Sequence, residues 1–214
     1  MTIVNGQRIG NQNGDGCIAI PSDPACGLKI DVNSPAYGWR DITSDITVRG
    51  TGSNDPAWAT FRTNINSYQF AVNDECWIDF HIPHDYVPGS ELYIHAHWGV
   101  NSAVTANSLT WSFDATYSKR NDTTPPVFAA TINKTVSHDA SAVNLAQYCH
   151  VVSEVQLTTS GALTGQDIEV DGIILTRASL SANTLGTNPF LFFIDIHYQS
   201  NNMATKNKAP NFYA

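Results

Sequence analysis

The sequence predicts an all-β protein: an antiparallel β-sandwich with jelly-roll-like connections and extended N- and C-terminal arms. Three observations predict this fold class. Between about Trp39 and Tyr198, short apolar–polar alternations follow one another, separated by turns rich in Gly, Pro, Asn and Ser. No long segments of helical period lie between them. The two ends of the chain lack the apolar periodicity needed to bury themselves in a core of their own.

The chain is expected to have three parts: an N-terminal arm at 1–35, a β-sandwich domain at 36–200 and a C-terminal arm at 201–214. Its 214 residues suit one all-β domain, and 42% hydrophobic residues can fill a core. Ordering a backbone residue costs about 1–2 kcal/mol, so arms this polar are expected to be held by a neighbouring chain.

The first elements of the sandwich are the least regular. Residues 39–48 alternate weakly, as in an edge strand. Residues 58–70 carry β-branched and Asn residues that favour strand or loop, although the first half could form a helical turn.

Three clear alternations follow, at 75–82, 92–98 and 109–117, and each predicts a strand with one buried face. Their inward-facing residues are Cys76, Ile78, Phe80 and Ile82 in the first, Leu92, Ile94, Ala96 and Trp98 in the second, and Leu109, Trp111, Phe113, Ala115 and Tyr117 in the third. Only 140–148 offers a short helical window. Further strands are predicted at 126–135, 150–157, 171–178 and 189–198.

Composition also limits the partners and the compartment. The net charge of −8 and the pI near 5.1 argue against nucleic-acid binding, which normally needs a basic patch. No apolar run approaches the roughly 20 residues of a membrane helix. The first residues lack the basic and apolar regions of a signal peptide, so synthesis in the cytosol is expected.

The four cysteines show no C-x-x-C spacing, so a zinc ribbon is unsupported. Cys17 and Cys26 could close a loop in the N-terminal arm, but a reducing cytosol favours free thiols. Cys76 and Cys149 lie in strand-like contexts, where cysteine acts as a small core residue.

Seven histidines are the natural place to look for chemistry. His95 and His97 project from one face of one predicted strand, at a spacing that can chelate a metal ion. Asp79/His81 and Asp195/His197 repeat the arrangement on two other strands. If these strands were neighbours, all three pairs could approach one ion. His138 and His150 have less support as ligands.

Several interpretations of the histidines remain open. A cupin-like enzyme would need a Glu soon after His97, and none is present, although His197 and Asn201 match the second cupin spacing. Three copies of His95 and His97 could instead surround one ion on a threefold axis. The imidazoles could also simply hydrogen-bond on a half-buried polar face. The chain has no catalytic Ser elbow, phosphate loop or H-E-x-x-H motif, so we expect no enzyme.

Four segments resemble those of a family of tailed-bacteriophage virion proteins. The resemblance runs from about Trp39 to the C-terminus and leaves the N-terminal arm unmatched. The segments are His81-Ile-Pro-His-Asp-Tyr86, His95-Ala-His-Trp98, Asp195-Ile-His-Tyr-Gln-Ser200 and Lys206-Asn-Lys-Ala-Pro-Asn-Phe-Tyr213.

This resemblance implies a structural protein of the virion, made in the host cytoplasm and without a required cofactor. A capsid decoration (cement) protein fits best: a homotrimer on the capsid surface whose arms clamp the major capsid protein. The alternatives are a fibre domain that binds a host glycan and a cupin-like metal enzyme. The residues expected to bind the partner are Arg8, Ile9, Ile18, Ile20, Lys206, Lys208, Pro210, Phe212 and Tyr213.

Overall fold

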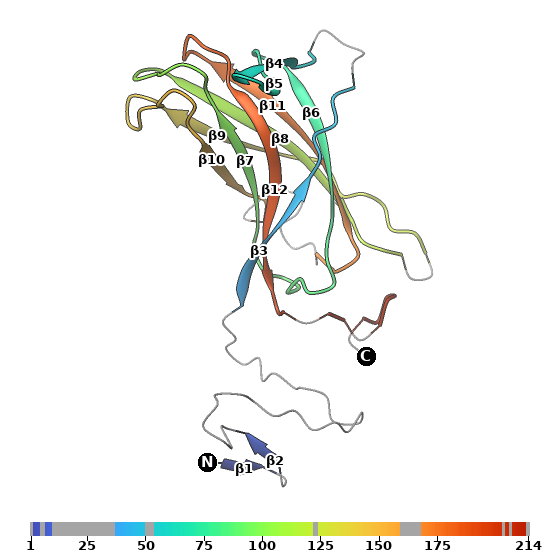
Figure 1. Ribbon diagram of the computed structural model, residues 1–214. Helices are drawn as coiled ribbons and strands as arrows, with labels where there is room; N and C mark the ends of the chain where they lie inside the picture. The colour runs from blue at the N-terminus through green and yellow to red at the C-terminus, as the bar shows by residue number, and fades with distance from the viewer. Residues whose placement is uncertain are drawn as a thin grey trace. The chain divides into compact units, whose positions relative to one another are not determined.

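The computed structural model describes residues 2–4, 7–9, 37–49, 54–121, 124–158, 168–202, 204–205 and 207–212 (Figure 1). The chain divides into two units, Met1–Ala36 and Tyr37–Ala214. In the first unit, strands β1 (Thr2–Val4) and β2 (Gln7–Ile9) form an antiparallel pair. The expected C-terminal arm belongs to the second unit rather than standing apart from it.

The second unit is all-β over its described residues, as predicted, and contains no helix there. Its strands are β3 (Gly38–Ser44), β4 (Ala57–Arg62), β5 (Ile65–Gln69), β6 (Glu75–His81), β7 (Leu92–Gly99), β8 (Ser108–Ser118), β9 (Ile132–Asp139), β10 (Val151–Gln156), β11 (Ile173–Asn183) and β12 (Phe190–Ser200).

Two antiparallel sheets pack face to face (Figure 1). One has the order β10-β7-β12, with β3 and the β4–β5 hairpin pairing with the other edge of β12. The second has the order β6-β11-β8-β9. From β6 to β12, successive strands cross between the sheets at every step except β8 to β9. This connectivity is that of a jelly roll, so the predicted fold class is confirmed.

The core lies between the two sheets. The inward-facing residues predicted for β6, β7 and β8 are all buried, because each strand gives alternate side chains to the interior. Trp98 and Trp111 pack edge to face at the centre, with ring centroids 6.4 Å apart. Cys76 is a buried free thiol, as expected.

The predicted edge strand near Trp39 is confirmed as β3, which joins the two sheets. Residues 38–44 pair with β12, whereas Thr47 forms a bridge with Trp77 of β6 in the opposite sheet. The irregular segment at 58–70 is the hairpin β4–β5, and Thr63 in its turn has a φ of 49°.

Two predicted elements are wrong. The strand expected at 126–135 begins only at Ile132, because Pro125 and Pro126 have no N–H to donate and the preceding residues form a projecting connection after β8. The helical window at 140–148 forms turns instead. Leu145 pairs there with Val104, and Tyr148 adopts a φ of 61° that no right-handed helix accommodates.

Candidate functional site

Histidines and carboxylates gather on the outer face of the first sheet. His95 on the central strand β7 lies directly opposite Glu154 of β10 and Asp195 of β12. Directly opposite residues in antiparallel strands point to the same face. The condition set by the sequence, that the histidine-bearing strands be neighbours, therefore holds for β7 and β12. The third pair, Asp79 and His81, lies on β6 in the other sheet and takes no part, because sheet order cannot be deduced from strand patterns.

His95 is held between two carboxylates. Its Nε2 lies 2.8 Å from Glu154 Oε2, and its Nδ1 lies 3.4 Å from Asp195 Oδ1. Since a carboxylate oxygen accepts, Nε2 donates its hydrogen to Glu154. The neutral ring then carries its lone pair on Nδ1, which faces Asp195.

His97, two residues further along β7, also has a polar group beside each ring nitrogen. Its Nε2 lies 3.2 Å from Asp195 Oδ2, and its Nδ1 shares a hydrogen with His150 Nε2 at 2.9 Å. The ring stacks on Phe193, with centroids 4.1 Å apart, so its orientation is fixed. His150, which had little support from the sequence, therefore belongs to the site.

The cluster is buried more deeply than an outer sheet face usually is. Asp195 is only 4% exposed, and within the described part of the chain neither its Oδ1 nor His97 Nε2 has a hydrogen-bond partner. Burial raises the pKa of Asp195, although His97 and His95 oppose the shift. Burial also lowers the pKa of His97, outweighing the opposite effect of Asp195. Burial thus penalises the charged form of both side chains, and a bound cation would offset this penalty for Asp195.

A second group shares His95 and is more exposed. His197 Nε2 lies 3.4 Å from Asp41 Oδ1, and the His197 ring packs edge to face on His95 and on Trp39. Ligand-type atoms of Asp41, His95 and His197 lie within 4.8 Å of one another. Asp41 is 55% exposed, so water can solvate this group.

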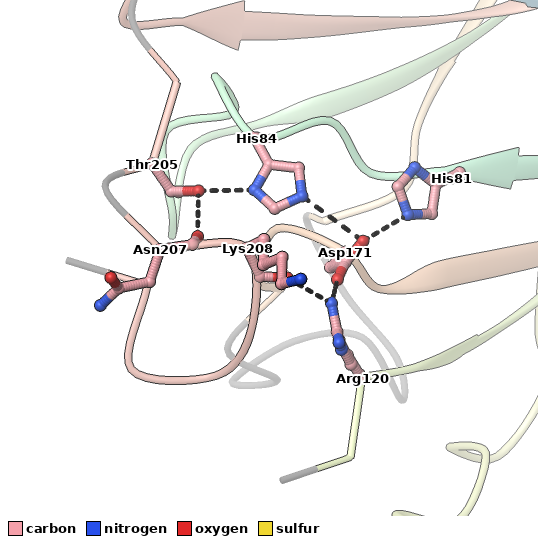
Figure 2. A network of polar contacts seen from close by, with 7 residues as sticks. All are labelled: His81, His84, Arg120, Asp171, Thr205, Asn207 and Lys208. Atoms are coloured by element: carbon pink, nitrogen blue, oxygen red, sulfur yellow. Dashed lines mark hydrogen bonds and ion pairs between the residues drawn. The ribbon is translucent and has the colours of Figure 1, made fainter.

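The C-terminal segment is tied to the sandwich by a second polar network (Figure 2). Asp171 accepts hydrogen bonds from Arg120 and from His81, whose Nε2 is 2.8 Å away. Arg120 also donates to the carbonyl oxygen of Lys208 at 2.5 Å. His84 Nδ1 lies 2.5 Å from the Thr205 hydroxyl. The segment therefore docks on its own domain.

This docking corrects one expected partner-binding residue. Phe212 is 7% exposed and packs on the His84 ring, with centroids 5.6 Å apart, so it belongs to the core of its own chain and cannot fill a pocket on a partner. Lys208 has an exposed side chain and Pro210 is half-buried, and their partner contacts stay predictions. Arg8 and Ile9 lie in β2 of the N-terminal unit. Outside the described residues lie Ile18, Ile20, Lys206 and Tyr213, as do Cys17 and Cys26.

Comparison with known proteins does not identify a family. No protein-family model matches the sequence, and no curated protein matches it. Among solved structures, the chain is similar to a Clostridium thermocellum protein containing the CBM22-1 and GH10 modules of endo-1,4-β-D-xylanase 10B in complex with xylohexaose. The identity is 10% and the TM-score 0.32, over 79% of this chain and 28% of that one. Within the described residues, no helix is long and apolar enough to cross a membrane.

Proposed function

We propose that this chain is a structural protein of a tailed-phage virion, a capsid decoration protein that binds the shell as a homotrimer. One observation carries the proposal: the N-terminal residues form a unit separate from the sandwich. The only described strands of that unit, β1 and β2, pair with each other. A segment that forms a compact unit of its own can bind a neighbouring subunit, as decoration proteins require of their arms.

The surface of the sandwich is consistent with this role. Val127 and Phe128, in the projecting connection between β8 and β9, are 88% and 46% exposed. Trp58 on the β4–β5 hairpin is 62% exposed. Large apolar side chains of this kind are favoured at contacts between subunits. Only 14% of the residues are charged, and a surface with few charged side chains likewise suits close protein contacts.

The experiment measures binding to shells assembled from the cognate major capsid protein. Full-length protein should sediment with these shells, and a variant lacking Met1–Gly27 should bind much more weakly. A matched control keeps residues 1–27 in a shuffled order, which preserves length and composition but should not restore binding. Equal binding by all three proteins would contradict the clamp role of the arm. Unchanged thermal unfolding of the sandwich in each variant shows that only attachment was altered.

Glycan binding by a fibre domain is the second candidate, and exposed aromatic side chains favour it. Trp39 is 43% exposed and packs against Tyr93 at a centroid distance of 5.6 Å on the outer sheet face. Aromatic faces of this kind can stack on sugar rings. Three results together would replace the decoration role with this one. The isolated protein would adsorb to host cells, Trp39→Ala would abolish this adsorption, and the protein would not bind to shells.

A further inference from the structure

Three potential ligand groups on adjacent strands converge on one point. Ligand-type atoms of His95, His97 and Asp195 all lie within 4.8 Å of one another. The distances from the Asp195 oxygens to the two imidazole nitrogens are 3.4 and 3.2 Å. Ligand atoms about 2.1 Å from one ion are about 3.0–3.4 Å apart at octahedral or tetrahedral angles. Both distances from the aspartate to the imidazoles match this spacing, and all three ligand atoms are close enough together to approach one cation.

Metal binding needs a lone pair on each convergent nitrogen, and the hydrogen-bond partners of both imidazoles permit the tautomers that supply it. Glu154 accepts the Nε2 hydrogen of His95, which leaves the Nδ1 lone pair facing Asp195. When His97 donates its Nδ1 hydrogen to His150 Nε2, the lone pair on its Nε2 faces the same carboxylate. Asp195 Oδ1 and His97 Nε2 have no hydrogen-bond partner among the described residues. Buried acceptors that face one another are unfavourable without a positive charge between them.

We propose that His95, His97 and Asp195 bind one divalent transition-metal ion per chain, with Glu154 as a positioning residue for His95. Two imidazoles and one carboxylate suit first-row ions such as Zn²⁺, Fe²⁺ and Ni²⁺, and leave coordination positions open. A carboxylate behind a ligating imidazole is the usual outer support of such sites. The proposal is independent of the assembly role, since either could fail without the other.

The intra-chain site differs from two other arrangements of the same histidines. An ion on a threefold axis would bind three chains and would not use a buried aspartate from each. A proton shared between His95 and Asp195 would also satisfy their facing atoms, with the imidazolium held between Asp195 and Glu154. Stoichiometry separates the first arrangement from our proposal, and metal titration separates the second.

The test is calorimetric titration of the chelator-treated full chain with Zn²⁺, followed by metal analysis after dialysis. One ion per chain is expected. Asp195→Asn, which keeps the side-chain shape but removes the charge, should weaken binding by more than about 100-fold. His97→Gln should weaken binding to a similar extent, and it replaces Asp195→Asn in the test if that variant fails to fold. His138→Ala, which alters a histidine in the opposite sheet, should bind as the unaltered chain does.

Glu154 is tested with Co²⁺, whose visible spectrum reports coordination geometry. Glu154→Ala should weaken Co²⁺ binding by about 10–100-fold and alter the spectrum. Glu154→Gln, whose amide oxygen still accepts from His95, should recover part of the affinity. No stoichiometric Zn²⁺ binding, one ion per three chains, or equal binding by Asp195→Asn and His97→Gln would overturn the proposal. Equal Co²⁺ spectra in both Glu154 variants and the unaltered chain would remove the positioning role.

Discussion

At the scale of single residues, Asp171 is a carboxylate held in a polar network outside the histidine cluster. It contacts Arg120, His81 and His84, and its side chain is 13% exposed. Burial alone would raise its pKa, but the hydrogen bonds from Arg120 and His81 outweigh burial and lower the pKa below its ordinary value. Because the folded pKa is depressed, the ionised form stabilises the fold.

This pKa shift predicts how stability depends on pH. The contribution of Asp171 is fully present above its unfolded pKa of about 3.9, and is lost as the pH falls through the lower folded value. Asp171→Asn should therefore reduce the free energy of unfolding by about 1–2 kcal/mol at pH 7, and the difference from the unaltered chain should vanish once the pH falls below the depressed folded pKa of Asp171. Asn tolerates the φ of 64° at this position. Urea unfolding over this pH range measures the effect, and Asp79→Asn, at an exposed position, should change the free energy of unfolding by less than about 0.5 kcal/mol at pH 7.

Residue patterns predicted only part of the histidine cluster. Alternation along β7 placed His95 and His97 on one outward face, and the same spacing singled out Asp195 and His197. Glu154 and His150 gave no such signal. Glu154 reaches the cluster through cross-strand register, and His150 through a contact with His97 just before β10 begins, and no local pattern encodes either. His81 had an equivalent pattern but lies in the other sheet.

At the scale of elements, the docked C-terminal segment should contribute to the stability of the sandwich. Phe212, within this segment, is 7% exposed and packs on the His84 ring. Truncating it removes buried apolar surface and leaves a cavity, so Phe212→Ala should lower the free energy of unfolding by about 3 kcal/mol. Val127→Ala, at a side chain 88% exposed, should change it by less than about 0.5 kcal/mol. If Phe212→Ala and Val127→Ala changed the free energy of unfolding equally in chemical denaturation, the segment would not be docked in solution.

Strand β7 makes a close backbone approach at its end that only glycine accommodates. A Cβ at Gly99 would lie 2.1 Å from the carbonyl oxygen of Cys149 and 3.2 Å from the Phe192 ring. Gly99→Ala should therefore shift the backbone and destabilise the fold by about 1–3 kcal/mol or more.

Gly38 in β3 provides the matched control for this substitution. The atom nearest to a Cβ added at Gly38 belongs to the Asn202 side chain and lies 3.9 Å from it. Gly38→Ala should leave the unfolding midpoint nearly unchanged, because a strand loses little when Ala replaces Gly in open space. If both variants unfolded alike, the close approach at Gly99 would be relieved in solution.

Elements with regular alternation could be predicted, whereas connections could not. The strands at 75–82, 92–98 and 109–117 each bury one face, so their period of two is visible in the sequence. The turns at 140–148 and the connection before Ile132 depend on distant partners. Thr116 donates to the carbonyl oxygen of Ala129, and Leu145 pairs with Val104, and neither contact leaves a local signature.

At the scale of the whole molecule, the jelly roll joins strands that are far apart in sequence. β3 near the start of the sandwich pairs with β12 at its end. The described core residues all come from the unit Tyr37–Ala214. Closing these long-range pairings should make folding slow, in the millisecond-to-second range typical of β-sandwiches, and cooperative within this unit alone.

A fragment of residues 37–214 should therefore fold without the N-terminal unit. Its thermal midpoint should agree with that of the full chain within about 2 °C, since Tyr37–Ala214 forms a compact unit of its own. Far-UV circular dichroism and calorimetry of both proteins measure this. A fragment ending at residue 203 is the opposite control, because it removes Phe212 and the contact from Arg120 to Lys208 and should unfold at a lower temperature. If loss of residues 1–36 lowered the midpoint as much as loss of residues 204–214, the N-terminal unit would be part of the sandwich, and its role as a separate clamp would be untenable.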